Sequence, residues 1–450
     1  MAESSPDIAA GRLAPADYAA AFEDVKPPLD TRQALVESSR CYFCFDAPCI
    51  EACPTGIDIP GFIRAIATGN LKGAATGILD ENIMGGMCAR VCPTEVLCEQ
   101  ACVRNDAEGK PVRIGALQRH ATDWLLDNGV QPFRRGPASG KRVAVVGGGP
   151  AGLACAHRLA LLGHAVTVFE ARDKLGGLNE YGIAAYKTPD GFARREVAFI
   201  LSVGGIEPAT GQALGRELSL AGLRRDFDAV FLAIGLGGVN ALQLAGEAMA
   251  GVEDAVAYIA RLRQADDLST LPVGRRVVVI GGGNTAIDIA VQSRRLGAED
   301  VTIVYRRGPG QMGATPHEQE FAQTNGVRIR HWARPVRLVA SGGALSAVDF
   351  ERTEVDGGGR LVGTGESYTL PADMLFKAIG QSFLPLPAAA GGAEALEMTG
   401  GRIAVDAERR TSLPGVFAGG DCVAGLDLTV QGVQDGKLAA HAIDRYLRGN

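Results

Sequence analysis

The sequence lacks long apolar runs and an excess of positive charge. No stretch of 18 consecutive apolar residues is present, and the start MAESSPDIAAGRL has neither the basic residues nor the apolar run of a secretory signal. A membrane-spanning helix is therefore not expected. The net charge is −6 at pH 7, which argues against a general nucleic-acid binder. We expect a cytoplasmic protein with no membrane or nucleic-acid partner.

Cysteine is scarce outside one short region. Eight of the 10 cysteines lie between Cys41 and Cys102. In a reducing compartment, such clustering indicates a metal site rather than disulfides. The isolated residues Cys155 and Cys422 are interpreted as packing residues, because the spacing offers them no redox partner.

A dinucleotide-binding pattern begins at Arg142. The segment RVAVVGGGPAGL runs from an apolar strand into the loop Gly147-x-Gly149-x-x-Gly152 and then into a helix. In this pattern the glycines permit a tight turn, close approach of a pyrophosphate and close helix–strand packing. A second strand, HAVTVF, ends at Glu170, where an acid can accept the ribose hydroxyls. We interpret the unit as an FAD site; the alternative is a glycine-rich turn without a ligand.

The pattern is repeated 134 residues later. The loop Gly281-x-Gly283-x-x-Ala286 again joins a strand to a helix, which indicates a second dinucleotide, NAD(H) or NADP(H). Its second strand ends at Tyr305 and is followed by two arginines, Arg306 and Arg307. Arginines there can bind a 2′-phosphate, which favours NADPH. Residues 308–316 add no basic residue, so NAD versus NADP stays open, and a solvated basic turn is the alternative for the two arginines.

The chain then returns to the flavin. TSLPGVFAGGDC places Asp421 after a strand and two glycines, and residues 428–447 have the pattern of a helix behind it. We therefore predict an α/β protein in which a helical iron–sulfur domain precedes two Rossmann-like domains. The NAD(P) domain is expected to be inserted in a split FAD domain. The predicted segments are 1–135 (iron–sulfur), 136–265 (FAD, first part), 266–380 (NAD(P)) and 381–450 (FAD, second part).

The clustered cysteines form two runs. These are Cys41-x2-Cys44-x4-Cys49-x3-Cys53-Pro54 and Cys88-x3-Cys92-Pro93-x4-Cys98-x3-Cys102, separated by a helical pattern over residues 60–82. Eight thiols and two Cys-Pro pairs favour two ferredoxin-like 4Fe–4S clusters. The alternative is two structural zinc sites, although only one CxxC pair is present.

Together these motifs resemble a known module. GGGPAGL, GGLNEYGI, GGGNTAID, YRR and VFAGGDC, preceded by CYFCFDAPCIEACPTGIDIP and CARVCPTEVLCEQAC, are similar to the flavin/iron–sulfur module of the glutamate synthase small subunit and of the N-terminal half of dihydropyrimidine dehydrogenase. In the latter family a glutamine completes one cluster, and Gln118 lies at the matching position, 20 residues after Cys98. On sequence alone, Gln118 would otherwise be read as a surface helix residue.

The resemblance implies specific ligands and contacts. One cluster would use Cys41, Cys44, Cys49 and Cys102, and the other Cys53, Cys92, Cys98 and Gln118, which leaves Cys88 spare. The expected FAD contacts are Val91, Gly147, Gly149, Pro150, Ala151, Gly152, Glu170, Gly177, Leu178, Lys187, Gly420, Asp421, Thr429 and Val430. The expected NAD(P) contacts are Gly281, Gly282, Gly283, Asn284, Thr285, Arg306, Arg307, Ala378, Ile379 and Gly380.

The resemblance also implies a function. The sequence has no unit able to form an FMN-binding barrel, so the chain resembles the electron-input subunit of bacterial NAD-dependent dihydropyrimidine dehydrogenase. Such a subunit passes electrons from NAD(P)H, through FAD and two clusters, to an FMN-bearing iron–sulfur catalytic subunit that reduces uracil or thymine to the 5,6-dihydropyrimidine. We predict no catalytic acid or base in this chain. The alternatives are a glutamate synthase (NADPH) small subunit and a stand-alone NAD(P)H:acceptor reductase.

Overall fold

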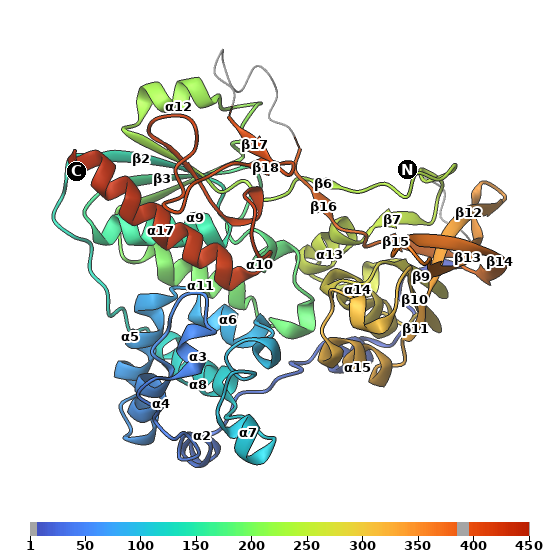
Figure 1. The fold of residues 1–450 in the computed structure, drawn as a ribbon, viewed down its shortest axis with the longest axis horizontal. Coiled ribbons are helices and arrows are strands. Elements are labelled where there is room, and N and C mark those ends of the chain that lie inside the picture. The colour runs from blue at the N-terminus through green and yellow to red at the C-terminus, as the bar shows by residue number, and fades with distance from the viewer. Residues whose placement is uncertain (1–6, 385–395, 450) are drawn as a thin grey trace. The chain divides into compact units, whose positions relative to one another are not determined.

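The structure is a computed structural model that describes residues 7–384 and 396–449. Its elements form a helical region and two parallel sheets with flanking helices (Figure 1). The chain divides into two units. The first comprises Met1–Val25, Tyr181–Pro189 and Gly238–Ser382, and the second comprises Lys26–Glu180, Asp190–Gly237 and Phe383–Asn450. The described part of the predicted iron–sulfur segment, 7–135, is thus shared between the units at Val25. The bounds of the four predicted segments remain a prediction.

The helical region belongs to the second unit. The side chain of Asp30 caps its first helix by accepting a hydrogen bond from Gln33 N, and Gln33 accepts one from Asp30 N in return. The helical pattern over residues 60–82 is split in two, because Gly69 has a φ of +78° and the Asn70 side chain caps the next helix. The helices are α2 (Thr31–Ser38), α3 (Pro48–Glu51), α4 (Ile59–Ala67), α5 (Leu71–Glu81), α6 (Gly85–Val91), α7 (Arg104–Glu108) and α8 (Ile114–Asp127), with a 3₁₀ turn η1 (Thr94–Val96).

The same unit contains a five-stranded parallel sheet. In spatial order its strands are β19 (Val416–Ala418), β5 (Ala229–Leu232), β2 (Arg142–Val146), β3 (Ala165–Glu170) and β4 (Ile206–Thr210). Because β19 pairs with β5, the C-terminal segment completes the sheet begun at Arg142, which confirms the split domain. The flanking helices are α9 (Pro150–Leu161), α10 (Leu178–Tyr181, whose last residue falls in the first unit), α11 (Phe192–Leu201), α12 (Leu220–Asp226) and α17 (Thr429–Arg448).

Helices α9 and α17 pack closely behind this sheet. The contact depends on small residues, since a Cβ added to Gly436 would lie 2.1 Å from Ala151 O and 2.8 Å from Cys155 N. Cys155 and Cys422 are both fully buried, as expected of packing residues. The start of α17 is thereby fixed beside the start of α9.

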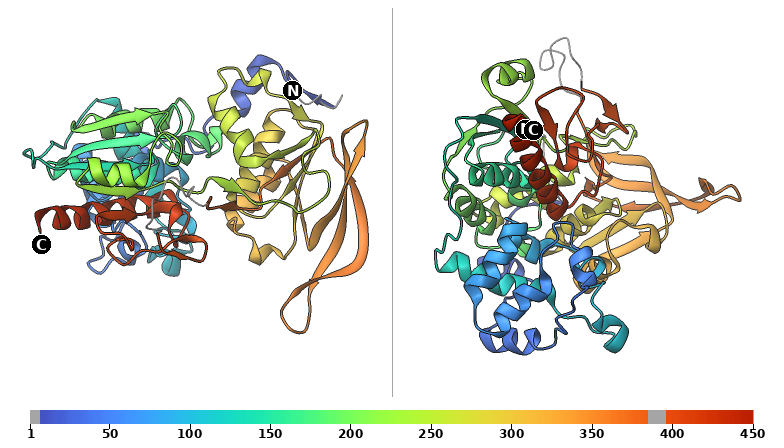
Figure 2. Two further views of the ribbon diagram at one scale, coloured as in Figure 1. Left: turned by 90° about the horizontal axis from the view of Figure 1, so that it is seen from above. Right: turned by 60° about the vertical axis from the view of Figure 1, so that its left-hand side comes forward.

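The first unit contains the second parallel sheet. Its order is β11 (Arg328–His331), β10 (Asp300–Tyr305), β9 (Arg276–Ile280), β15 (Met374–Lys377) and β7 (Val252–Asp254), with helices α13 (Ala255–Gln264), α14 (Asn284–Arg295) and α15 (Pro316–Thr324). An antiparallel sheet of β12 (Ala333–Ser341), β13 (Ala344–Val355) and β14 (Leu361–Pro371) is inserted before β15. Figure 2 shows this sheet in orange, extending from the parallel strands.

The remaining elements are short. They are β1 (Ile8–Ala9), α1 (Pro15–Ala21), η2 (Ala185–Lys187), β6 (Gly238–Val239), η3 (Leu268–Thr270), β8 (Val273–Gly274), η4 (Pro309–Gln311), β16 (Gln381–Ser382), β17 (Met398–Thr399), β18 (Arg402–Ile403) and η5 (Gly420–Cys422). In the described part of the chain, no helix has the length and apolarity needed to cross a membrane. The predicted α/β class, with a helical region and two Rossmann-like sheets, is confirmed.

Candidate cofactor sites

The first glycine loop joins β2 to α9. Gly147 has a φ of +108°, and a Cβ there would lie 2.1 Å from Ala233 O. A Cβ on Gly152 would lie 1.9 Å from Gly147 O. Both glycines are therefore required by the turn itself. Gly149 is different, because an added Cβ would meet only Gly177 Cα, at 3.7 Å. The backbone at Gly149 leaves room for a pyrophosphate at the start of α9.

Glu170 lies at the end of β3 beside this loop. Its side chain is buried, and its two carboxylate oxygens accept hydrogen bonds of 2.9 Å from Gly148 N and from Arg172 N. A carboxylate oxygen has two lone pairs, so each keeps one for a ribose hydroxyl. The structure thus holds the acid in the position that the sequence predicts.

The other predicted flavin contacts in this unit come from four segments: Val91 at the end of α6, Gly177 with Leu178, Gly420 with Asp421, and Thr429 with Val430. Gly177 packs on the loop so tightly that an added Cβ would lie 2.7 Å from Gly149 Cα. Thr429 Oγ1, at the start of α17, donates to Asn179 Oδ1 at 2.8 Å and ties α17 to the segment of Gly177 and Leu178. A Cβ on Gly432 would lie 3.5 Å from both Ala151 N and Pro150 Cβ. These contacts bring the starts of α9 and α17 together, and Val430 is buried.

Asp421 follows β19 in the turn η5. Gly420 N donates to Asp435 Oδ2 at 2.9 Å, which fixes the turn. Burial raises the pKa of Asp421 to about 6, and the neighbouring carboxylates Asp427 and Asp435 act in the same direction, against Arg402. A partly buried carboxylate of this kind gains from bonding a ligand hydroxyl, which is consistent with the predicted contact between Asp421 and FAD.

Lys187 is a predicted flavin contact that belongs to the first unit, with the second glycine loop. Its Nζ lies 2.8 Å from Asp288 Oδ1 and 2.9 Å from Glu318 Oε1. Burial alone would lower the pKa of Lys187, but the two carboxylates outweigh burial and raise it. The ammonium is therefore charged and neutralised within its own unit. Neither acid was singled out from the sequence, where nothing in their spacing marks them as partners of Lys187.

The second glycine loop joins β9 to α14. Gly281 has a φ of +147°, and an added Cβ would lie 2.1 Å from Ala378 O. At Gly282 it would meet the Tyr305 ring at 2.5 Å, whereas at Gly283 no atom lies within 4 Å. The open side of the loop is therefore at Gly283, where Asn284 and Thr285 begin α14. Ala378, Ile379 and Gly380 follow the neighbouring strand β15 at the same sheet edge.

Arg306 and Arg307 lie just beyond β10 with exposed side chains. Their backbone is fixed, since Arg306 O accepts from Thr353 Oγ1 at 2.8 Å and Arg307 O accepts from Trp332 N at 3.2 Å. Within residues 7–384 and 396–449, neither guanidinium forms an ion pair. Two such guanidinium groups beside a dinucleotide loop could bind a 2′-phosphate. Their exposure is equally consistent with a solvated basic turn.

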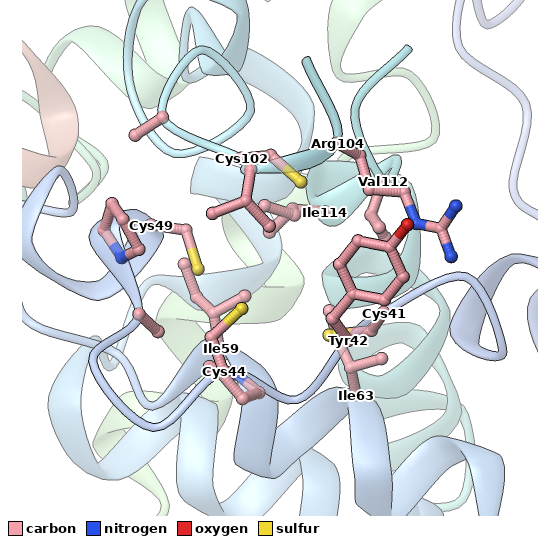
Figure 3. A pocket seen from close by; sticks show the side chains of 15 residues that line it. Cys41, Tyr42, Cys44, Cys49, Ile59, Ile63, Cys102, Arg104, Val112 and Ile114 are labelled. Carbon is pink, nitrogen blue, oxygen red and sulfur yellow. The ribbon is translucent and has the colours of Figure 1, made fainter. Parts of the chain in front are cut away.

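Four of the predicted cluster ligands line one pocket. Figure 3 shows Cys41, Cys44, Cys49 and Cys102 around it, with apolar neighbours that include Ile59, Ile63 and Ile114. Burial raises the pKa of Cys49 to about 12, and the nearby thiols of Cys102 and Cys41 add to the increase. Such thiols lose their protons when positively charged iron binds them. The pocket therefore suits an iron–sulfur cluster.

The second ligand set is also brought together. The pKa of Cys92 is raised by a hydrogen bond with Cys88, then by burial and by its neighbours Cys98 and Cys53. The pKa of Cys98 is raised by burial and then by Glu99 and Cys53. Cys53, Cys92 and Cys98 are therefore mutual neighbours. Cys88, which the resemblance leaves spare, adjoins Cys92 one helical turn away.

Gln118 lies on the buried face of α8. Its side chain is 7% exposed, and Nε2 donates to Gly85 O at 2.7 Å, so the reading of Gln118 as a surface residue is wrong. Among the described residues, no group of three or more His, Cys, Asp or Glu side chains is arranged so that it could hold a single metal ion. In a four-iron cluster each protein ligand binds its own iron, so the ligands need not converge on one point.

Two parts of the chain match known protein families. Residues 18–130 match the family described as dihydropyrimidine dehydrogenase domain II, 4Fe–4S cluster. Residues 141–436 match the pyridine nucleotide-disulphide oxidoreductase family. The first match decides between iron–sulfur and zinc in favour of iron–sulfur, and the second supports FAD and a nicotinamide dinucleotide.

Solved structures share the fold of the two Rossmann-like domains. FprA from Mycobacterium tuberculosis in complex with NADPH has a TM-score of 0.57 at 20% identity, over 69% of this chain and 85% of that chain. Thioredoxin reductase of Lactococcus lactis has a TM-score of 0.54 at 21% identity, over 69% of this chain and 100% of that chain.

Relatives of known name cover nearly the whole chain. The NAD-dependent dihydropyrimidine dehydrogenase subunit PreT of Salmonella typhimurium is 35% identical over 95% of this chain and 97% of its own length. PreT of Escherichia coli is 34% identical over 95% and 98%. The glutamate synthase [NADPH] small chain of Escherichia coli is 34% identical over 95% and 94%. The chain therefore belongs to the family of flavin/iron–sulfur subunits that includes PreT and the glutamate synthase small chain, and it is an NAD(P)-dependent oxidoreductase that transfers electrons.

Proposed function

We propose that this chain is the electron-input subunit of a cytoplasmic dihydropyrimidine dehydrogenase. It takes electrons from NAD(P)H and delivers them, through FAD and two 4Fe–4S clusters, to an FMN-bearing iron–sulfur partner subunit that reduces uracil or thymine. The observation that carries the proposal is the buried carboxamide of Gln118, in place of an eighth cluster cysteine.

The residues divide the task between them. The loops at Gly149 and Gly283 would bind the two pyrophosphates, while Glu170 and Asp421 would hold sugar hydroxyls. The bound flavin would accept two electrons together, and the clusters would carry one at a time. What the protein supplies is positioning and exclusion of water, so no catalytic acid or base is needed.

The neighbouring thiols in the structure support the two proposed ligand sets. Cys41, Cys44, Cys49 and Cys102 share the pocket of Figure 3. Cys53, Cys92 and Cys98 form the second group, to which the Gln118 oxygen would add the fourth ligand. Because Gln118 Nε2 is committed to Gly85 O, the carboxamide oxygen is the end left for iron.

The glutamate synthase small subunit is the second candidate. It is favoured by the 34% identity over 95% of the chain to such a subunit, and by the two unpaired arginines after β10, which suit NADPH. A stand-alone reductase would need neither partner. The two subunit functions differ in the partner that receives the electrons.

Substitution of Gln118 tests the ligand assignment. Gln118→Leu should lose or degrade one cluster while FAD stays bound, and Gln118→Cys should keep the iron but change one reduction potential. Iron analysis and electron paramagnetic resonance of the reduced protein measure both effects. Gln100→Leu, at an exposed position of the same region, is the matched control. Two unaltered clusters in Gln118→Leu would remove the assignment.

Reconstitution tests the partner. We expect the chain to support uracil-dependent oxidation of NAD(P)H when it is mixed with an FMN-barrel subunit that carries its own cysteine runs. Glutamate formation with a large amidotransferase synthase, and no uracil reduction, would favour the second candidate. Full activity on a natural acceptor by the chain alone would favour the stand-alone reductase.

A further inference from the structure

One buried acid lies outside the predicted sites. Glu196 on α11 is 2% exposed, and its Oε1 accepts a hydrogen bond from Met87 N at 2.9 Å. A Cβ added to Gly86 would lie 2.9 Å from the same oxygen, so the carboxylate also lies beside the Gly86 backbone. In the part of the chain that the structure describes, Glu196 forms no ion pair. This part of the unit thus places a buried carboxylate without an ion pair at the start of α6.

The Gln118 side chain reaches the same backbone from the opposite side. Its Nε2 donates to Gly85 O at 2.7 Å. Gly85 O and the N–H of Gly86 belong to one peptide group, which accepts from Gln118 and lies beside the Glu196 carboxylate. A charge beside a peptide group polarises it, so an ionised Glu196 strengthens the hydrogen bond at the Gly85 carbonyl.

Glycine at both positions makes this connection possible. A Cβ on Gly86 would lie 2.6 Å from Phe192 Cζ and 2.9 Å from Glu196 Oε1. A Cβ on Gly85 would lie 2.5 Å from Ile78 Cγ2. Neither position has room for a side chain, so α8 and α11 both reach the α6 backbone directly.

The other charged groups facing Glu196 largely satisfy one another. Arg90 on α6 donates to Gly86 O at 3.0 Å and to both oxygens of Asp123 on α8, at 2.8 and 2.9 Å. Arg119 on α8 also donates to Asp123, at 3.1 Å. Arg90 favours the ionised form of Glu196 and Asp123 opposes it. Glu196 is thus the buried acid of this group that lacks an ion-pair partner.

We propose that Glu196 is a positioning residue for Gln118, acting through the peptide group that joins Gly85 to Gly86. The ionised carboxylate polarises that peptide, strengthens the hydrogen bond from Gln118 Nε2 and so turns the carboxamide oxygen toward the cysteines. Donation from the amide nitrogen also increases the electron density on the amide oxygen, which makes it a better iron ligand. This inference rests on the proposed role of Gln118 as a cluster ligand.

A change in the charge of Glu196 should then reach the cluster. Burial raises the pKa of Glu196 to about 7, against the hydrogen bond from Met87 and the charge of Arg90. Reduction of a cluster held by Gln118 would add negative charge nearby, and Glu196 would then bind one proton from solvent, which forms an O–H bond on its carboxylate. Because reduction takes up a proton, the reduction potential of this cluster falls as the pH rises through neutrality.

A redox titration tests the proposal. The potentials of both clusters, followed by electron paramagnetic resonance between pH 6 and 8, should show one pH-dependent and one pH-independent cluster in the unmodified protein. In Glu196→Gln the amide cannot ionise, so the pH dependence should disappear and the potential should rise, with iron and FAD retained. Glu207→Gln, at an exposed acid of the same unit, should behave like the unmodified protein.

The outcomes separate this proposal from the proposed function. If both clusters of the unmodified protein have pH-independent potentials, the role of Glu196 is wrong while the ligand set stands; this measurement needs no variant to fold. A pH dependence that persists in Glu196→Gln also overturns it. If Gln118→Leu instead keeps both clusters, the ligand assignment on which the proposal rests is wrong.

Discussion

The two glycine loops of this chain make the same turn for different ligands. The first glycine of each has a positive φ, and at each a Cβ would lie 2.1 Å from a carbonyl oxygen just beyond the neighbouring strand, Ala233 O in one case and Ala378 O in the other. The middle glycines, Gly149 and Gly283, both have free space where a side chain would point. The turn and its open side are thus properties of the strand–loop–helix unit.

The loops differ at the third small residue and after the second strand. Gly152 leaves no room for a Cβ, whereas Ala286 is accommodated and fully buried. After the first loop, the second strand β3 ends with the buried acid Glu170, whereas after the second loop the strand β10 is followed by exposed Arg306 and Arg307. We propose that the residues at the end of this strand determine which dinucleotide binds, and that the third small residue sets how closely helix and strand pack.

The middle glycines should give the largest effects. In Gly149→Val the side chain would occupy the space proposed for the pyrophosphate, while its Cβ clashes with nothing in the protein. Loss of charge-assisted bonds at about 1.5–3 kcal/mol each should weaken FAD binding by about 3 kcal/mol or more. We expect flavin-free protein, measured by absorbance and by released FAD.

Gly283→Val is the matched variant in the other loop. It should keep stoichiometric FAD and lose binding of NAD(P)H. The lost binding should be measurable as a large rise in the KM of NAD(P)H for flavin reduction. If both variants lose the same cofactor, or if Gly149→Val keeps its FAD, the assignment of the two loops is wrong.

Gly152→Ala should have the next largest effect, and it acts on the fold. The new Cβ would lie 1.9 Å from Gly147 O and 3.2 Å from Val145 Cγ1, so α9 must move away from β2. Overpacking of this kind costs about 1–3 kcal/mol of unfolding free energy. Chemical denaturation, with FAD content as a second readout, should show the loss. Stability equal to that of the unmodified protein would mean that α9 is not held as tightly as the distances imply.

Most of the nucleotide-binding architecture could be predicted from the sequence, because it is local. A strand, a glycine loop, a helix and a second strand follow one another within about 30 residues, and the structure has them at β2 to β3 and again at β9 to β10. The pairing of β19 with β5 is long-range, and VFAGGDC predicted only that this segment returns to the flavin-binding domain. The cysteine spacing favoured two clusters, whereas the two expected ligand sets came from the family resemblance and stay a prediction.

The missed features depend on contacts between distant segments. The pairing of Lys187 with Asp288 and Glu318 joins residues about a hundred or more positions apart. Glu196 meets Met87 across 109 positions, and no periodicity marks an acid on an amphipathic helix as buried. The burial of Gln118 also required the structure, since without the family resemblance α8 offers no reason to single it out.

The arginines after β10 test specificity within the second loop. Replacing Arg306 and Arg307 by Ala should weaken NADPH binding by about 1–3 kcal/mol, the scale of lost charge-assisted hydrogen bonds, and leave NADH nearly unchanged. Flavin reduction by each nucleotide, measured by stopped flow, gives the two constants. Equal losses for both nucleotides, or none for either, would assign the arginines to a solvated turn.

Ala286→Gly should give the smallest effect, and it completes the comparison of the third positions. Ala286 is buried in the first turn of α14, so its removal costs helix propensity and one methyl contact without disturbing the loop. We expect a loss of about 1 kcal/mol in unfolding free energy, the ordinary penalty for glycine in a helix, with little change in KM for NAD(P)H. The comparison of the loops therefore predicts that Gly152→Ala lowers the unfolding free energy more than Ala286→Gly does. If Ala286→Gly costs as much as Gly152→Ala, the difference between the loops does not lie in the helix–strand distance, and the third small residue has the same role in both.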